Sequence, residues 1–232
     1  MLGVLVNTLA VIVGSGLGLV FRRGIPEKIT RAVMSAIGLC TLYLGFSGAL
    51  AGRNALITII ALVLGTALGT VLDIDGAINR LGKWAERAIN RGKPGQLEGS
   101  GSIGEGFVTA SLLFCVGAMT VVGSLNAGMG DHSMLFAKSV LDLIAAAMLS
   151  VSLGLGVMLS AAFVLVFQGA IALFAGVLKP LLSDSAIAEM TCAGSLLILA
   201  LGLNLLGITK LKIADMMPAI VLAPVLVLLG IF

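Results

Sequence analysis

Long uncharged stretches separated by short charged gaps are the main pattern of this chain. The uncharged runs cover residues 1–21, 32–52, 54–72, 106–130, 143–178, 190–209 and 216–232. The hydrocarbon core of a bilayer needs about 20 mostly apolar residues for each helix that crosses it, and most of these runs reach that length. The pattern predicts a polytopic membrane protein with nearly all of its residues in lipid.

These runs predict an all-α transmembrane helical bundle of eight spans, in a single integral membrane domain over 1–232. The expected spans are 2–21, 32–50, 55–72, 106–125, 134–154, 157–178, 188–207 and 217–232. The fifth and sixth come from one run that is too long for a single crossing, and the small residues at 150–156 permit a tight turn between them. The last span is short and contains Pro218 and Pro224, and as a half-helix it would leave seven spans.

Lysine and arginine are distributed unevenly between the expected loops, and this distribution predicts the orientation. Cytoplasmic loops of membrane proteins are enriched in these residues. With the N-terminus outside, the inner loops hold eleven of the 14, and the outer side holds only Arg53, Lys138 and Lys179. Both termini are therefore expected outside, and the first apolar segment is expected to be a retained helix.

Composition excludes several classes of function. Hydrophobic residues make up 59% of the chain and charged residues 11%, whereas soluble domains carry about 25% charged residues. The net charge of +3 comes from basic residues in loops, without the interleaved aromatics of a nucleic-acid-binding stripe. The three cysteines lie singly in apolar runs without neighbouring histidines, so no metal site and no cofactor are expected. The expected partners are the lipid bilayer, a small solute or ion, and further copies of the chain, with no nucleic acid.

The one sizeable polar segment, 73–105, predicts a helix on the inner leaflet followed by a linker. Apolar residues from Ile74 to Ile89 fall on one helical face and basic residues on another, with Trp84 between them. Residues 93–102 are rich in glycine and serine, which is typical of a flexible connector. A passive connector is the favoured interpretation, and a regulatory or partner-docking element is the alternative.

Glycine spacing suggests two related halves. Gly3 and Gly14 are eleven residues apart, as are Gly106 and Gly117, and the second and seventh spans share a Gly–Leu pattern. Spans 1–3 would then correspond to spans 4, 7 and 8, with spans 5 and 6 as an inserted helical hairpin. Because three spans is an odd number, the second half would be inverted, giving the 3+3 inverted repeat found in many secondary transporters.

Glycines also predict close helix packing. Small residues four apart let helix backbones approach one another in membranes. The glycines assigned to helix packing are Gly14, Gly18, Gly65, Gly69, Gly117 and Gly123.

Asp142 is the strongest candidate for chemistry. It lies two turns into the fifth span, about 12 Å along a helix that rises 1.5 Å per residue. A charge at the centre of a membrane helix costs about 2.5–3.5 kcal/mol on insertion scales, and Lys138, one turn earlier on the same face, can pair with it. Two interpretations stay open: an ion pair that holds two helices together, and a proton or cation relay or ligand contact.

Other polar residues within or beside the spans are candidates for a substrate or ion pathway. Amides and hydroxyls in apolar helices form hydrogen bonds between helices or contact a ligand. Around 117–130, several glycines would also let the backbone unwind and present carbonyls, which membranes tolerate only where the break is enclosed by protein or lines a cavity. The pathway candidates are Asn7, Thr120, Ser124, Asn126, Lys138, Ser139, Asp142 and Asn204.

At these residues the chain resembles the YdfK/YqgA family of uncharacterised bacterial inner-membrane proteins. The resemblance covers essentially the whole length and implies a location in the bacterial cytoplasmic membrane, without a settled substrate. It is carried by Gly117-Ala118-Met119-Thr120-Val121-Val122-Gly123-Ser124-Leu125-Asn126 with Lys138-Ser139 and Asp142, by Val6-Asn7 with Gly14-Ser15, by Gly194-Ser195-Leu196-Leu197, and by Met217-Pro218-Ala219.

Three classes of function remain. The favoured one is a small secondary transporter or channel for a small solute or ion, in which Asp142→Asn is expected to abolish uptake or binding. The second is a non-catalytic membrane component that assembles through its glycine faces. The third is an intramembrane aspartyl protease, suggested by Gly128-Met129-Gly130-Asp131. That chemistry needs two carboxylates that share a proton, and no second acid is placed opposite Asp131, so the chain is not expected to be an enzyme.

Overall fold

The structure is a computed structural model that describes residues 1–22, 27–80, 103–116 and 118–230, and it contains helices and no strands in those ranges. The all-α prediction is confirmed. The helices are α1 (Leu2–Arg22), α2 (Glu27–Ala49), α3 (Ala55–Val71), α5 (Ile103–Cys115), α6 (Ala118–Gly128), α7 (Ser133–Leu153), α8 (Leu155–Leu173), α9 (Ala175–Leu181), α10 (Asp184–Leu205), the 3-10 helix η2 (Ile213–Met216) and α11 (Pro218–Leu228).

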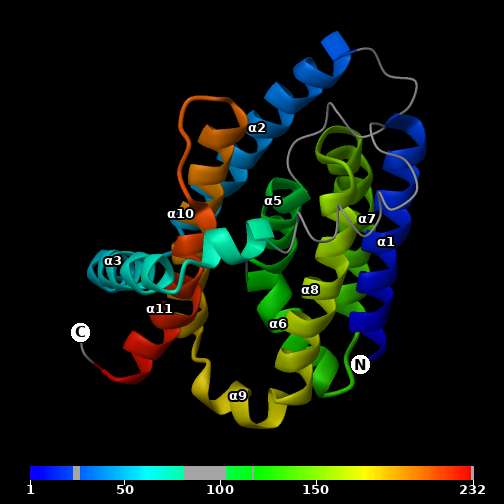
Figure 1. Ribbon diagram of the computed structural model, residues 1–232. Helices are drawn as coiled ribbons and strands as arrows, with labels where there is room; N and C mark the ends of the chain where they lie inside the picture. Colours follow the sequence, from blue (N-terminus) through cyan, green and yellow to red (C-terminus); the bar gives the residue numbers. More distant parts are fainter. Residues whose placement is uncertain (23–26, 81–102, 117, 231–232) are drawn as a thin grey trace.

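One lobe is built on α1 and α7, which run parallel in close contact (Figure 1). Gly3 of α1 faces Leu135 of α7, and further along α1 Gly14 and Gly18 face the backbones of Leu143 and Ala147. The missing side chains at Gly14 and Gly18 allow the two backbones to touch, as the small-residue spacing predicts.

The lobe is completed by α8, which returns antiparallel to α7. Helix α7 ends at Leu153 and α8 begins at Leu155. Gly154 between them has a φ of 70°, a left-handed conformation that residues with a Cβ rarely adopt. The predicted split of the long apolar run is confirmed at this glycine.

The predicted fourth span, 106–125, is two helices and not one. Helices α5 and α6 meet at a bend of 67°. Gly156, near the start of α8, faces Ile103 and Gly106 of α5, whereas Gly128 at the end of α6 faces Ala172. The bent pair therefore follows α8 along its whole length, as one broken span would. Gly117, predicted as a packing residue, lies outside the described residues.

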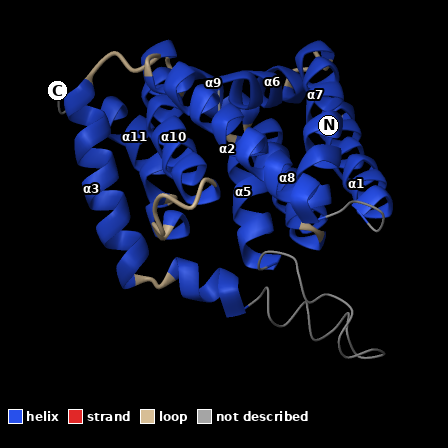
Figure 2. Ribbon diagram, turned by 90° about the horizontal axis from the view of Figure 1, so that it is seen from above, coloured by secondary structure: helices blue, strands red, loops and turns tan. Residues whose placement is uncertain are grey.

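The second lobe pairs α2 with α10 and α3 with α11, each pair antiparallel. Gly45 of α2 faces Leu199 of α10, Gly38 faces Leu206 directly after α10, and Gly65 of α3 faces Ala219 of α11. Gly69, one turn further along α3, faces Asp215 of η2. Figures 1 and 2 together show α3 lying across the axes of α1, α7 and α8.

The two lobes meet at the bend between α5 and α6. Val116, between the two helices, packs on Gly194 of α10, where no side chain stands in its way. Ile37 and Met34 of α2 also join the apolar core around Phe114 and Ala146 of the first lobe. Residues of both lobes therefore pack against the ends of the helices at the bend, and such contact with protein is what a broken helix at membrane depth requires.

Among the residues that the structure describes, four helices are long and apolar enough to cross a membrane: α1, α7, α8 and α10. The number rises to six if two bent pairs each count as one span: α5 with α6, and α3 with the helix Ile74–Arg80. Two shorter apolar helices cover Met34–Ala49 and Ile213–Leu228. The eight-span count and the inverted repeat stay predictions. Of the expected surface helix and linker at 73–105, the structure describes Ile74–Arg80 as helix, while Trp84 and the whole linker 93–102 lie outside the described residues.

Candidate functional site

An ion pair lies on the face of α7 that is buried against the neighbouring helices. Lys138 Nζ is 2.7 Å from each carboxylate oxygen of Asp142. The two residues are one helical turn apart, and they are only 6% and 5% exposed. Burial removes both charges from solvent, so each depends on the other for compensation.

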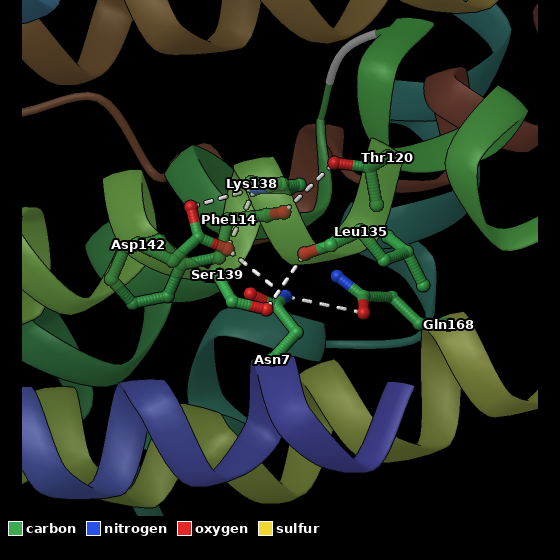
Figure 3. A network of polar contacts seen from close by, with 8 residues as sticks. All are labelled: Asn7, Phe114, Thr120, Leu135, Lys138, Ser139, Asp142 and Gln168. Atoms are coloured by element: carbon green, nitrogen blue, oxygen red, sulfur yellow. Dashed lines mark hydrogen bonds and ion pairs between the residues drawn. The ribbon is translucent and has the colours of Figure 1, made fainter. Parts of the chain in front are cut away.

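Two amides from neighbouring helices join the pair (Figure 3). Asn7 Nδ2 of α1 donates to Asp142 Oδ2 at 3.0 Å and to Gln168 Oε1 of α8 at 3.2 Å. An ionised carboxylate only accepts hydrogen bonds, so Asp142 requires Asn7 to present its NH2 group. Asn7 in turn requires Gln168 to present its oxygen. The orientation of both amides therefore follows from the charge on Asp142.

The network is not closed. Asn7 and Gln168 are fully buried, yet Asn7 Oδ1 and Gln168 Nε2 have no hydrogen-bond partner among the described residues. Buried polar atoms in native proteins nearly always have a partner from protein, water or ligand. These two atoms mark a position where a further polar group fits.

The predicted hydroxyls of Ser139, Thr120 and Ser124 differ in their hydrogen bonding. Ser139 donates to Leu135 O at 2.7 Å, a bond within α7. Thr120 of α6 donates to Phe114 O of α5 at 3.0 Å and so bridges the bend next to Lys138 (Figure 3). Ser124, one turn further along α6, is fully buried, and its hydroxyl has no partner in the described part of the chain. Gly123, on the same turn, faces Leu135 of α7.

Two predicted pathway residues lie elsewhere. Asn204 is bonded to Thr209 and Leu211, which fixes the loop after α10. Asn126 stands near the end of α6, where its carbonyl accepts from the amides of Met129 and Asp131. The structure gives both asparagines a local turn role and brings neither into the network around Asp142.

Gln168 is the site residue that sequence reasoning missed. It interrupts the apolar sequence of α8 in the same way that Asn7 interrupts α1. A lone amide in a predicted span is a usable signal, but its partner cannot be known before the helices are placed.

Glu189 of α10 is a second buried acid that the sequence analysis did not single out. It is 1% exposed and has no lysine or arginine bonded to its carboxylate among the described residues. Instead, Oε1 accepts from the backbone amides of Arg53 and Asn54, each at 2.7 Å, and Oε2 accepts from the Thr58 hydroxyl at 2.8 Å. The carboxylate thus binds the N-terminal end of α3, where helix amides lack partners of their own.

Replacing this acceptor is expected to destabilise the second lobe. Glu189→Gln substitutes a donor for one carboxylate oxygen and leaves a backbone amide or the Thr58 hydroxyl unpaired, at a cost of about 1–3 kcal/mol. Thermal unfolding of the purified protein in detergent measures the loss. Asp184→Asn, at an exposed acid five residues earlier on α10, is the matched control and should unfold like wild type. An equal Tm for both variants would contradict this role of Glu189.

The geometry around Asp131 does not favour the protease interpretation. Asp131 is exposed in the loop between α6 and α7 and accepts from the Ser133 backbone amide at 3.0 Å. This hydrogen bond lowers the pKa of Asp131 below its ordinary value. A catalytic carboxylate pair instead shares a proton, so that one of its two pKa values is raised.

The apolar helices and the enclosed charged network define a helical integral membrane protein. The chain belongs to the family described as "Protein of unknown function (DUF554)", whose model matches residues 2–228. It is 30% identical to the uncharacterized membrane protein YdfK of Bacillus subtilis (strain 168) over 98% of this chain and 96% of the relative. It is 31% identical to the uncharacterized protein YqgA of Escherichia coli (strain K12), over 96% and 94% respectively. No solved structure matches the chain.

Proposed function

We propose that this protein is a small secondary transporter or channel, and that the network of Asn7, Lys138, Asp142 and Gln168 is its solute or ion site. The observation that carries the proposal is the incomplete hydrogen bonding of this buried network. A network that only joined helices would gain by satisfying every polar atom in it. Ionisable residues inside membrane helices are rare, and they commonly mark substrate or ion pathways.

The position of the network supports this function. It lies where α1, α7 and α8 meet, beside the bend between α5 and α6. Transporter sites commonly lie next to discontinuous membrane helices. The Thr120 hydroxyl donates to Phe114 O and so links α6 to α5 beside this network.

The proposal includes the cytoplasmic membrane of a bacterium as location and both termini outside. The Met1 amine lies 3.4 Å from Ala127 O, so the N-terminus lies at the end of the first lobe where α6 ends and α7 begins. The basic Arg22 lies at the opposite end of α1. The excess of lysine and arginine at that end favours it as the cytoplasmic one. The proposed function of the protein is transport and not catalysis.

A screen for solute-dependent stability tests the proposal. Ions, sugars, amino acids and carboxylates are added to the purified protein in detergent, because a ligand of the folded state raises its apparent stability. A solute of this site should raise the Tm of wild type and not that of Lys138→Gln/Asp142→Asn, which lacks both charges. In vesicles, Asp142→Asn should fail to take up that solute. Wild-type uptake by this variant would remove Asp142 from the mechanism.

A further inference from the structure

We propose that the site takes a small monovalent anion together with one proton, the proton on Asp142 and the anion on Lys138 and Gln168. This inference rests on the proposed transport function and specifies its substrate class and its coupling ion.

The unused hydrogen-bonding groups of the network are mostly donors. A lysine ammonium has three N–H groups, and Lys138 directs two bonds to Asp142. Gln168 Nε2 carries two more N–H groups, and it has no partner within the described residues. Against these three N–H groups stands one unused acceptor, Asn7 Oδ1. A ligand that completes the network must therefore bring more acceptors than donors, as a small anion does.

Charge balance leads to the same ligand class. Lys138 and Asp142 are neutral as a pair, and an unpaired charge buried at this depth would be costly. An anion added alone would leave the site negative, and a cation added alone would leave it positive. One proton on Asp142 frees the Lys138 ammonium, and one anion then restores neutrality. The proton and the anion thus enter together and leave together, with no net charge moved.

The groups that face Asp142 can accommodate this change. On α7 its charged neighbour is Lys138, and the titratable neighbour from α5 is the buried Cys115 thiol. Helices α1 and α8 contribute the neutral amides Asn7 and Gln168. A protonated Asp142 has an O–H to donate, and Asn7 Oδ1 accepts it once the amide turns. That rotation breaks the bond to Gln168 Oε1, so the Gln168 side chain can move to direct its unpartnered NH2 group at the anion.

The test is anion-dependent unfolding of the purified, full-length protein, with chloride, nitrate, formate and acetate as probes at two pH values. For wild type, at least one anion should bind about tenfold more tightly for each unit that the pH falls, since one proton is taken up with it. Asp142→Asn mimics the protonated acid, and it should bind the same anion with an affinity that does not change with pH. Lys138→Gln should lose binding, while Lys138→Arg should retain it.

Further variants guard against simple misfolding. Lys138→Gln/Asp142→Asn leaves no buried charge at the site and should fold without binding any anion. Ser160→Ala removes a buried α8 hydroxyl that is bonded to Val157 O at 2.6 Å, away from the network, and should behave like wild type. Asp142→Asn, with Lys138 unpaired, should have a low Tm in anion-free buffer that the anion raises.

Two results would overturn the inference. One is the failure of all four anions to stabilise wild type at either pH. The other is stabilisation by sodium, potassium or guanidinium that is lost in Asp142→Asn, which would make the site a cation site and leave the transport proposal intact. The transport proposal fails separately, if every stabilising solute acts equally on Lys138→Gln/Asp142→Asn.

Discussion

Lys138→Met is expected to destabilise the protein by about 3–5 kcal/mol, because it leaves the Asp142 carboxylate buried without its counter-charge. Methionine nearly matches the length and volume of the lysine side chain, so the loss comes from charge and hydrogen bonding. Lys138 makes both of its side-chain bonds to Asp142, and Asn7 would remain as the donor bonded to that carboxylate.

The matched variant is Lys138→Met/Asp142→Asn, in which no charge remains. Replacing both members of a buried ion pair is often close to neutral, so the double variant should be more stable than Lys138→Met alone. Denaturant titration of the detergent-solubilised protein gives both free energies of unfolding. If the double variant loses as much as the two single variants added together, Lys138 and Asp142 are not coupled, and the geometry of the pair is wrong.

Adding side chains between α1 and α7 should have the other large effect. Gly14→Ala/Gly18→Ala places two methyl groups against the backbones of Leu143 and Ala147. Backbone cannot move aside as a flexible side chain can, and overpacking costs about 1–3 kcal/mol at each position. Because Asn7 and Asp142 meet across this interface, separating the helices should also weaken solute binding.

The control uses two glycines of the same lobe. At Gly16 an added methyl group makes only an ordinary contact with Met158, and at Gly169 it meets nothing within 4 Å. Gly16→Ala/Gly169→Ala should therefore keep or raise the Tm, since alanine favours a helix more than glycine does, by about 1 kcal/mol. Equal melting of the two double variants would show that α1 does not pack on α7 through Gly14 and Gly18.

Local sequence signals predict the longest helices of the fold and the turn between α7 and α8. The apolar runs that produce α1, α7, α8 and α10 are long enough to stand out without knowledge of their neighbours, and Gly154 permits the turn that the long run requires. Lys138 and Asp142 could be paired from sequence because an i,i+4 contact depends only on the helix that holds both.

Features that depend on tertiary contacts could not be predicted in the same way. The bend after Cys115 lies in an apolar run that reads as one helix, and Val116 packs there on Gly194, far away in the sequence. Gln168 and Glu189 are polar residues in apolar helices, but their partners, Asn7 and the residues at the start of α3, are known only once the helices are placed. Asn204, by contrast, lies in a predicted span but forms its hydrogen bonds with the loop that follows its own helix.

The distance between the Lys138 ammonium and the Asp142 carboxylate in lipid bilayers tests the central claim most directly. Solid-state NMR of protein labelled at lysine Nζ and aspartate Cγ measures this distance through the dipolar coupling of the two nuclei. Nitrogen–oxygen separations of 2.7 Å imply a strong coupling between the Lys138 Nζ and Asp142 Cγ nuclei, and Asp142→Asn should abolish it. Because the pair is buried, these nuclei should receive little magnetisation from bulk water. A spectrum without that coupling, or an Asp142 carboxylate in contact with lipid chains or bulk water, would contradict an enclosed ion pair and the site built on it.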